Sequence, residues 1–201
     1  MSCNQSNTDE PASWARPPRR IVIVGNSGAG KSTLARRLSA LLGYPHIELD
    51  ALYHGPAWVP REQFKADVDR LCRAQGRWIV CGNYCQVRAL LWSRADAVIW
   101  LDLSRRQVMR QLVPRTLNRM VRRTLLWNGN RERLRNLFRW DPELNLLRWA
   151  FTKHQAYVAT YEAMLDDARY AALRFYRLRT SADVARIADD FARLLEAEHR
   201  A

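Results

Sequence analysis

The stretch RRIVIVGNSGAGKSTLARRL, from Arg19 to Leu38, decides the fold of this 201-residue chain. It opens with an apolar, β-branched run from Ile21 to Val24, which is typical of a strand buried on both faces of a parallel sheet. The eight residues from Gly25 to Ser32 fit the pattern GxxxxGKS/T in full. An amphipathic run then ends at Gly43, which predicts a helix with a glycine C-cap. Strand, glycine-rich turn and helix in this order are the setting in which the motif binds phosphates.

The glycine-rich turn is predicted to hold the phosphate chain of ATP together with Mg²⁺. Its glycines let backbone amides converge on phosphate oxygens, and the dipole of the following helix adds to that attraction. We expect Lys31 to reach the β- and γ-phosphates as a catalytic residue, and the Ser32 hydroxyl to take one position on Mg²⁺. The residues predicted to bind the cofactor are Gly25, Asn26, Ser27, Gly28, Ala29, Gly30, Lys31, Ser32 and Thr33.

Strands and helices alternate along the rest of the chain. Short apolar runs predict further strands at 46–50, 77–81, 97–103 and 173–178. Helical patterns predict helices at 61–75, 104–126, 143–165 and 181–200, the last with Ser181 as its N-cap. This alternation predicts an α/β chain with a three-layer P-loop NTPase fold, in which helices cover both faces of a mostly parallel five-stranded sheet. Ligands of such sheets bind at the carboxyl ends of the strands.

Length and composition favour a single globular domain. The chain is 48% hydrophobic, a fraction typical of globular proteins. We expect a flexible N-terminal tail over 1–18 and one domain over 19–201, with a helical lid inserted at about 104–142. The sequence has no apolar run that could cross a bilayer and no secretory signal at its N-terminus, so we expect a cytoplasmic protein that does not bind membranes. The four cysteines lack the paired spacing of a zinc site or a disulfide framework.

Positive charge is the unusual bulk property, because 33 basic and 20 acidic side chains give a formal net charge of +13. Such a balance is often found in nucleic-acid-binding proteins, but a local cluster serves a polyanionic cofactor equally well. Many of the arginines fall between 105 and 148, where helical spacing places several on one face and an NGN turn offers a hinge. A solvated basic helix is the alternative. We expect the cluster to close over the transferred phosphoryl group through four catalytic arginines, Arg115, Arg119, Arg123 and Arg131.

Polar and aromatic residues follow the second and third predicted strands and are candidates for binding a phosphoryl acceptor. Asp50 ends the second strand and is predicted to be catalytic, either by taking a proton from the acceptor hydroxyl or by holding a water on Mg²⁺. A turn or helix-capping aspartate is the alternative. The predicted acceptor-binding residues are Asp50, Tyr53, His54, Trp58, Asn83 and Tyr84. Packing is the alternative for each aromatic ring among them, and it is the expected role of Trp127.

Five segments together resemble a known family: GNSGAGKST, ELDALYHGPAW, WIVCGNY, VIWLDLS and LLWNGNRERLRNLF. The chain is similar, from about Arg20 to Arg179, to the adenylate-kinase-like P-loop proteins often labelled topology modulation proteins. The resemblance implies a nucleoside-monophosphate-kinase-like fold with a lid and use of Mg-ATP, without naming a substrate. Family members usually carry an acid before GNY, where this chain has Cys81. Asp50 or Asp102 must then supply the second acid, or turnover is slow.

Two functions of different classes fit these observations. The favoured one is a Mg-ATP-dependent kinase that transfers the γ-phosphoryl group to a small acceptor, with catalysis by positioning and charge stabilisation. The alternative is a nucleotide-dependent protein that binds DNA and modulates its topology, although the sequence has no helix-turn-helix, zinc or RNA-binding signature. A degenerate nucleotide sensor is a third interpretation, which depends on Cys81 alone. Neither the oligomeric state nor the identity of the acceptor follows from the sequence.

Overall fold

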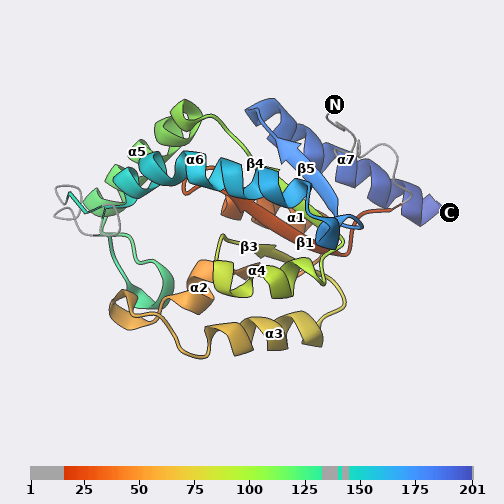
Figure 1. The fold of residues 1–201 in the computed structure, drawn as a ribbon, viewed down its shortest axis with the longest axis horizontal. Coiled ribbons are helices and arrows are strands. Elements are labelled where there is room, and N and C mark those ends of the chain that lie inside the picture. Colours follow the sequence, from red (N-terminus) through yellow and green to blue (C-terminus); the bar gives the residue numbers. More distant parts are fainter. Residues whose placement is uncertain (1–15, 133–139, 142–144, 201) are drawn as a thin grey trace.

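A five-stranded, wholly parallel sheet organises the computed structural model, which describes residues 16–132, 140–141 and 145–200 (Figure 1). The strands are β1 (Arg20–Gly25), β2 (His46–Glu48), β3 (Trp78–Cys81), β4 (Ala97–Leu101) and β5 (Arg174–Leu178), in the order β2-β3-β1-β4-β5. The longer helices are α1 (Lys31–Leu42), α3 (Phe64–Ala74), α4 (Cys85–Trp92), α5 (Arg105–Val121), α6 (Leu146–Leu165) and α7 (Ser181–Arg200). Short helical segments are α2 (Leu49–Tyr53), η2 (Pro56–Trp58), η3 (Trp127–Gly129) and η6 (Ala168–Tyr170).

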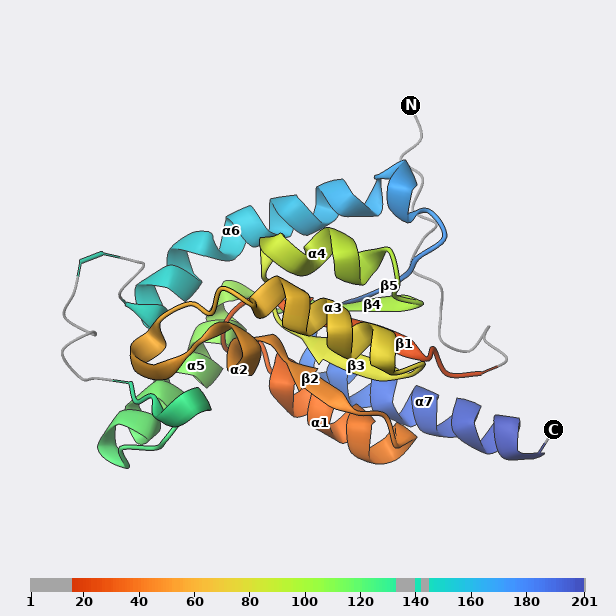
Figure 2. The same cartoon turned by 90° about the horizontal axis from the view of Figure 1, so that it is seen from below.

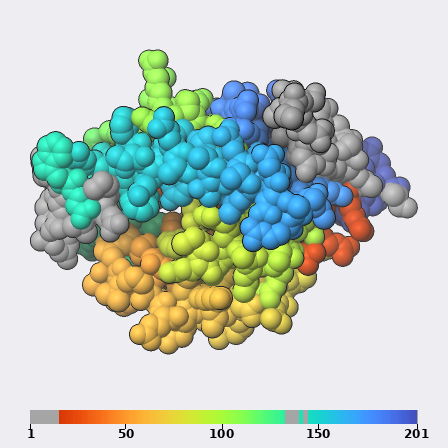
Figure 3. Space-filling model, viewed as in Figure 1, coloured from red at the N-terminus to blue at the C-terminus, as the bar shows by residue number. Residues whose placement is uncertain are grey.

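The sheet is covered by helices on both faces, which confirms the predicted three-layer α/β fold. Successive residues of β1 point to opposite faces: Ile21 and Ile23 pack with α1 and α7, whereas Val22 and Val24 pack with α3, α4 and α6. Figure 2 shows the two helical layers on either side of the sheet. In the space-filling view, α6 lies across one face of the molecule above α4 and α3 (Figure 3). None of the helices in the described ranges is long and apolar enough to cross a membrane.

Several predicted boundaries shift in ways that matter for the site. The second strand ends at Glu48, so Asp50 lies in the first turn of α2 rather than at a strand end. The predicted helix at 104–126 ends at Val121, because the chain turns left-handed at Arg123 with φ 48°. Helix α4, of eight residues, is not among the helices that the sequence predicts. The predicted tail at 1–18 and the lid at 104–142 both extend beyond the described residues, so these limits remain predictions.

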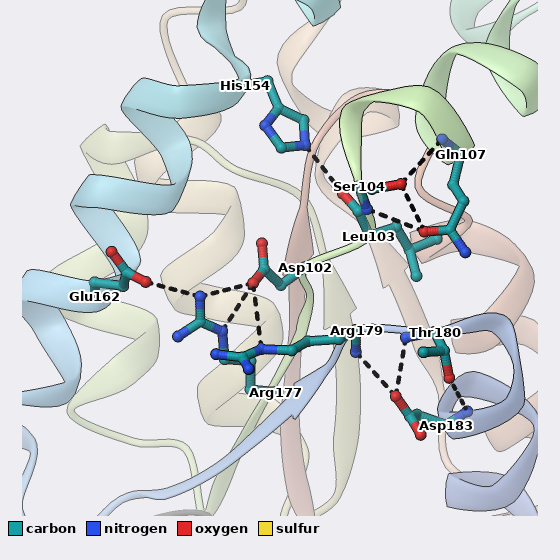
Figure 4. Close-up of polar contacts among 10 residues, drawn as sticks. All are labelled: Asp102, Leu103, Ser104, Gln107, His154, Glu162, Arg177, Arg179, Thr180 and Asp183. Atoms are coloured by element: carbon teal, nitrogen blue, oxygen red, sulfur yellow. Dashed lines mark hydrogen bonds and ion pairs between the residues drawn. The ribbon is translucent and has the colours of Figure 1, made fainter. Parts of the chain in front are cut away.

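The last helix is capped by Thr180 and not by the predicted Ser181. The Thr180 hydroxyl accepts a hydrogen bond of 3.1 Å from the backbone N–H of Asp183, and the Asp183 carboxylate accepts one of 2.9 Å from the N–H of Thr180 (Figure 4). This reciprocal pair satisfies backbone donors that the first turn of a helix leaves open. Ser181 is then the first helical residue.

Asp102, directly after β4, is engaged in an ion pair that ties the ends of two neighbouring strands to α6. Its Oδ2 accepts a 2.8 Å hydrogen bond from Nε of Arg177 on β5, and the same guanidinium donates to Glu162 of α6 at 2.8 Å (Figure 4). The side chains of Asp102 and Arg177 are only 11% and 16% exposed. This pairing gives Asp102 a structural role, so it is a poor candidate for the second acid.

Replacing Asp102 with asparagine is expected to lower the free energy of unfolding by about 2 kcal/mol, because the mostly buried Arg177 loses a charged partner. ATP affinity is expected to stay within about twofold of the wild type. Urea denaturation measures the first quantity and calorimetric titration the second. Asp189→Asn is the control, because Asp189 and its partner Arg37 are 67% and 52% exposed. Such an exposed ion pair contributes about 0.5 kcal/mol or less to the free energy of unfolding. Equal destabilisation by both variants would contradict the structural role of Asp102.

Candidate active site

The glycine-rich loop between β1 and α1 has the backbone geometry that its sequence predicts. Gly25 has φ 144°, and a Cβ atom there would lie 2.7 Å from the carbonyl oxygen of Leu101. Gly28 has φ 88°, and a Cβ atom would lie 2.7 Å from Cβ of Leu112 on α5. Glycine is therefore required at both positions by conformation and by space. The loop lies directly against β4 and α5.

Two asparagine side chains hold the phosphate loop in place. The buried Asn26 amide donates to the backbone carbonyl of Ala150 on α6 at 2.7 Å. The Asn83 carbonyl accepts from the N–H of Gly25 at 3.1 Å and from the Tyr161 hydroxyl at 3.0 Å, and its amide donates back to the carbonyl of Gly25. Both polar ends of Asn83 are thus engaged by the loop and α6, whereas the sequence predicted acceptor binding. The contribution of Tyr161 had no signal in the sequence.

Lys31 points back into its own loop. Its Nζ donates to the carbonyl oxygens of Gly25 at 2.8 Å and Asn26 at 3.1 Å. Burial lowers the pKa of Lys31, and the negative charge of Asp50 opposes that shift. A partly buried cation beside the loop is suited to a phosphate chain, because the phosphate charge is a far stronger partner than backbone carbonyls are.

A carboxylate that the sequence analysis did not select lies beside Ser32. The Ser32 hydroxyl donates to Oε1 of Glu48, the last residue of β2, and the other oxygen of Glu48 accepts a 2.9 Å hydrogen bond from the indole N–H of Trp127. Parallel pairing of β2 with β3 sets Glu48 opposite Cys81, so the neighbouring strand brings a carboxylate next to this cysteine. Strand pairing between β2 and β3 is the signal that would have found it.

The oxygen atoms of Ser32 and Glu48 fit the preference of Mg²⁺ for hard oxygen ligands. Within the described ranges, no three His, Cys, Asp or Glu side chains are grouped so that they could hold a metal ion by themselves. A partial ligand set of this kind suits Mg²⁺ that arrives with a nucleotide, because phosphate oxygens and water complete the coordination. We therefore expect Glu48, and not Asp50, to share the predicted metal site with Ser32.

Cys81 has a histidine neighbour that comes from another strand. Nε2 of His46 lies 3.1 Å from its Sγ, and the thiol also contacts the Ser32 hydroxyl at 3.8 Å. Burial is the main cause that raises the pKa of Cys81 to about 12, and the charge of Glu48 adds to it. Burial also lowers the pKa of His46. The two groups are neutral at pH 7, so this contact does not produce a reactive thiolate.

Native alkylation is expected to separate the cysteines clearly. Cys81 is buried and its raised pKa disfavours the thiolate, whereas Cys85 is exposed at the start of α4. We expect iodoacetamide to modify Cys81 at least about 100-fold more slowly than Cys85, and both at similar rates in urea. Peptide mass spectrometry against time measures each rate. Rapid native modification of Cys81 would show a thiolate there and reopen a catalytic role.

The candidate acceptor residues around Asp50 lie together. The Tyr84 hydroxyl donates to Oδ1 of Asp50 at 2.7 Å and lies 3.3 Å from Nε2 of His54. Burial and the Asp50 carboxylate raise the pKa of Tyr84 far above its ordinary value. Burial lowers the pKa of His54, although Asp50 opposes that shift. The Oδ2 atom of Asp50 has no hydrogen-bond partner among the residues that the structure describes.

Aromatic rings enclose this group. The Tyr53 and Tyr84 rings lie 4.4 Å apart between centroids, and the His54 ring lies 5.1 Å from that of Trp58. Trp127 stacks on His54 with centroids 6.4 Å apart. The predicted acceptor residues other than Asn83 therefore form one aromatic cluster beside Asp50, and whether they bind an acceptor remains a prediction.

The four predicted catalytic arginines divide into two pairs. Burial is the main cause that lowers the pKa of Arg115, and the charges of Arg119 and Lys31 act in the same direction. The carboxylates of Glu132, Asp50 and Glu48 oppose that shift. Arg119 pairs with Glu132 at 3.4 Å, and burial raises the pKa of that glutamate. The Arg123 and Arg131 side chains are exposed and have no hydrogen bond or ion pair with the site in the part of the chain described. Arg115 is therefore the strongest candidate of the four.

Comparison with known proteins supports the fold and leaves the activity open. No family model matches the sequence. The chain is 51% identical over 35 residues to a cytidylate kinase of Alkaliphilus metalliredigens and 41% identical over 34 residues to the ATP-dependent protease ATPase subunit HslU of Campylobacter jejuni. Each match covers 17% of this chain, and they span 16% and 8% of those two relatives.

A solved structure matches over most of the chain. Shikimate kinase from Bacteroides thetaiotaomicron is 16% identical with a TM-score of 0.50, and the match covers 90% of this chain and 99% of that enzyme. Together with the loop geometry, this likeness places the chain in the class of proteins with a P-loop kinase-like fold. At this level of identity the likeness shows the fold alone.

Proposed function

We propose that this chain is a kinase that transfers the γ-phosphoryl group of Mg-ATP to a hydroxyl of a small acceptor. The observation that carries the proposal is that Lys31, whose Nζ donates to the loop carbonyls of Gly25 and Asn26, lies near enough to Asp50 and Arg115 for their charges to act on it. A lysine at the phosphate loop, a carboxylate for the acceptor and an arginine are the parts that phosphoryl transfer to an acceptor requires. The kinase name of the short cytidylate kinase match supports the same class.

Each residue has a defined task in this proposal. The loop amides and Lys31 bind the β- and γ-phosphates, and Ser32 with Glu48 would hold Mg²⁺, which neutralises charge on those phosphates. The acceptor oxygen bonds to the γ-phosphorus while the bond from that phosphorus to the β-γ bridging oxygen breaks, and ADP leaves. The acceptor hydroxyl proton passes to Asp50, whose Oδ1 is held by Tyr84. Arg115 stabilises the negative charge on the transferred group.

The proposal includes three features of the resembled family of topology modulation proteins. The first is membership of that family, for which the ELDALYHGPAW and WIVCGNY segments are the support. The second is a basic lid at about 104–142, supported by the approach of Arg115 to the loop. The third is a cytoplasmic location, which agrees with unpaired Cys72, Cys81 and Cys85.

Steady-state ADP release tests the proposal. The rate is measured with Mg-ATP alone and with pooled nucleoside monophosphates, nucleosides, sugars or hydroxy acids, with Lys31→Ala as the control. We expect one pool to raise the wild-type rate at least about tenfold, a change in barrier near 1.4 kcal/mol. A rate that is equally fast without any pool would identify water as the acceptor and sink the proposal. ATP binding without turnover would favour the nucleotide sensor.

The net charge of +13 keeps a DNA-binding function as the second candidate. Binding to a duplex through many phosphates weakens steeply as salt rises. Tight duplex binding that weakens steeply with salt and responds to ATP would make DNA binding the favoured function. We expect weak binding, because Arg119 is paired with Glu132 and the charge of Arg115 acts on Lys31, Asp50 and Glu48 of the candidate site.

A further inference from the structure

The residues Trp127–Asn130, here called the WNGN turn, form a turn that its sequence suits closely. Asn128 and Gly129 have φ values of 55° and 76°, in the left-handed region that asparagine and glycine tolerate best. The N–H of Leu126 donates to the carbonyl of Asn130 at 2.8 Å and closes the turn. These residues were predicted to be a hinge, but the hydrogen bonds give the turn a defined shape.

The WNGN turn is docked on the segment that follows Asp50. The Asn128 amide donates to the backbone carbonyl of Ala51 at 3.2 Å and to that of His54. The Asn130 amide donates to the carbonyl of Gly55 at 2.8 Å, and Asn130 is only 4% exposed. Side chains of the turn thus satisfy carbonyls more than seventy positions earlier in the sequence. This docking fixes where Trp127 lies.

Trp127 reaches the metal-side carboxylate from this docked turn. Its indole N–H donates to Oε2 of Glu48 at 2.9 Å, while Oε1 of the same carboxylate accepts from Ser32. One oxygen of Glu48 is therefore held by the phosphate loop and the other by the WNGN turn. A glutamate has three side-chain torsions, and two charge-assisted hydrogen bonds fix them before any ligand arrives.

We propose that Trp127 is a positioning residue that holds the Glu48 carboxylate in the orientation needed for a metal–nucleotide complex. This inference rests on the proposed function, because it takes Ser32 and Glu48 as the metal side of a nucleotide site. Partners that orient the ligands of a metal change metal affinity by about 10- to 100-fold when they are removed. The turn that holds Trp127 also binds α2, which carries Asp50, so one element fixes both carboxylates of the site.

Nucleotide affinity with and without metal tests the inference. The dissociation constant of ATP is measured by calorimetry in EDTA and in saturating Mg²⁺, for the wild type, Trp127→Phe and Trp140→Phe. We expect all three proteins to bind ATP equally in EDTA, because Lys31 and the loop amides are unchanged. Mg²⁺ is expected to tighten ATP binding by the wild type. We expect this gain in affinity to be about tenfold smaller in Trp127→Phe. Mn²⁺ titration followed by electron paramagnetic resonance gives the metal affinity of the ATP complex directly.

Trp140→Phe is the control, because it makes the same substitution at a tryptophan that is 80% exposed and lies outside the candidate site. Trp127→Phe should have no further effect in a Glu48→Gln background. Benzothienylalanine at position 127, which replaces only the N–H, serves if phenylalanine disturbs folding. An unchanged metal gain in Trp127→Phe, or an equal loss in Trp140→Phe, would overturn the inference and leave the kinase proposal standing. Failure of the wild type to bind ATP would overturn both.

Discussion

Lys31→Met is expected to reduce the rate of phosphoryl transfer by about 10³-fold. Nζ of Lys31 lies within 3.1 Å of two loop carbonyls and is a partly buried cation beside the place where the phosphate chain is expected to bind. Methionine keeps the length of the side chain and removes its charge. Loss of one preorganised donor to developing charge typically costs 10²- to 10³-fold, and a full charge directed at the transferred group costs at least the upper value.

The measurement is the rate of ADP release with a stimulating acceptor, under saturating Mg-ATP. Lys65→Met is the matched control, because Lys65 is exposed on α3 and far in sequence from the loop. We expect the control to keep the wild-type rate. Comparable loss in the two variants, or a Lys31→Met rate within a few-fold of the wild type, would contradict the assignment of Lys31.

Asp50→Asn is expected to slow transfer to the acceptor by 10²- to 10⁴-fold, the range typical of a lost general base. Asparagine has the same shape and still accepts a hydrogen bond from the Tyr84 hydroxyl, so the 2.7 Å contact and the local fold are preserved. The variant cannot take the acceptor proton. ATP affinity is expected to stay unchanged, because Ser32 pairs with Glu48 and not with Asp50.

Single-turnover transfer and ATP titration separate the two effects. Asp166→Asn is the control, because Asp166 is exposed at the end of α6. If Asp50→Asn instead weakened Mg-ATP binding and left transfer from bound ATP unaffected, Asp50 would act on the metal side and not on the acceptor. A variant that keeps full activity would return Asp50 to the helix-capping alternative.

The part of the fold that local patterns determine could be predicted from the sequence. The run from Ile21 to Val24, the loop from Gly25 to Ser32 and the glycine at 43 each carry a local signal, and each takes the expected form. Strand and helix alternation then fixed the layers, because parallel strands need crossover connections. The prediction that Asp50 ends the second strand is wrong. Helix α2 begins immediately after Glu48, so Asp50 lies in its first turn.

Contacts between distant segments account for what was missed. Glu48 meets Ser32 because β2 pairs with β3, and the same pairing brings His46 to Cys81. The sequence predicts only packing for Trp127. Its hydrogen bond to Glu48, 79 positions earlier in the sequence, depends on the docking of the WNGN turn. Periodicity describes which face a residue takes on its own element, but it holds no information on which element lies opposite.

The destination of the γ-phosphoryl group tests the central claim most directly. ATP labelled with ³²P at the γ-position is incubated with Mg²⁺ and the acceptor pools, and the labelled products are separated by chromatography. The proposed function predicts that the wild type and Asp166→Asn transfer the ³²P label to an organic acceptor. Lys31→Met and Asp50→Asn are expected to form little of this labelled organic phosphate. Label found only in inorganic phosphate, or left in bound ATP with every pool, would contradict it.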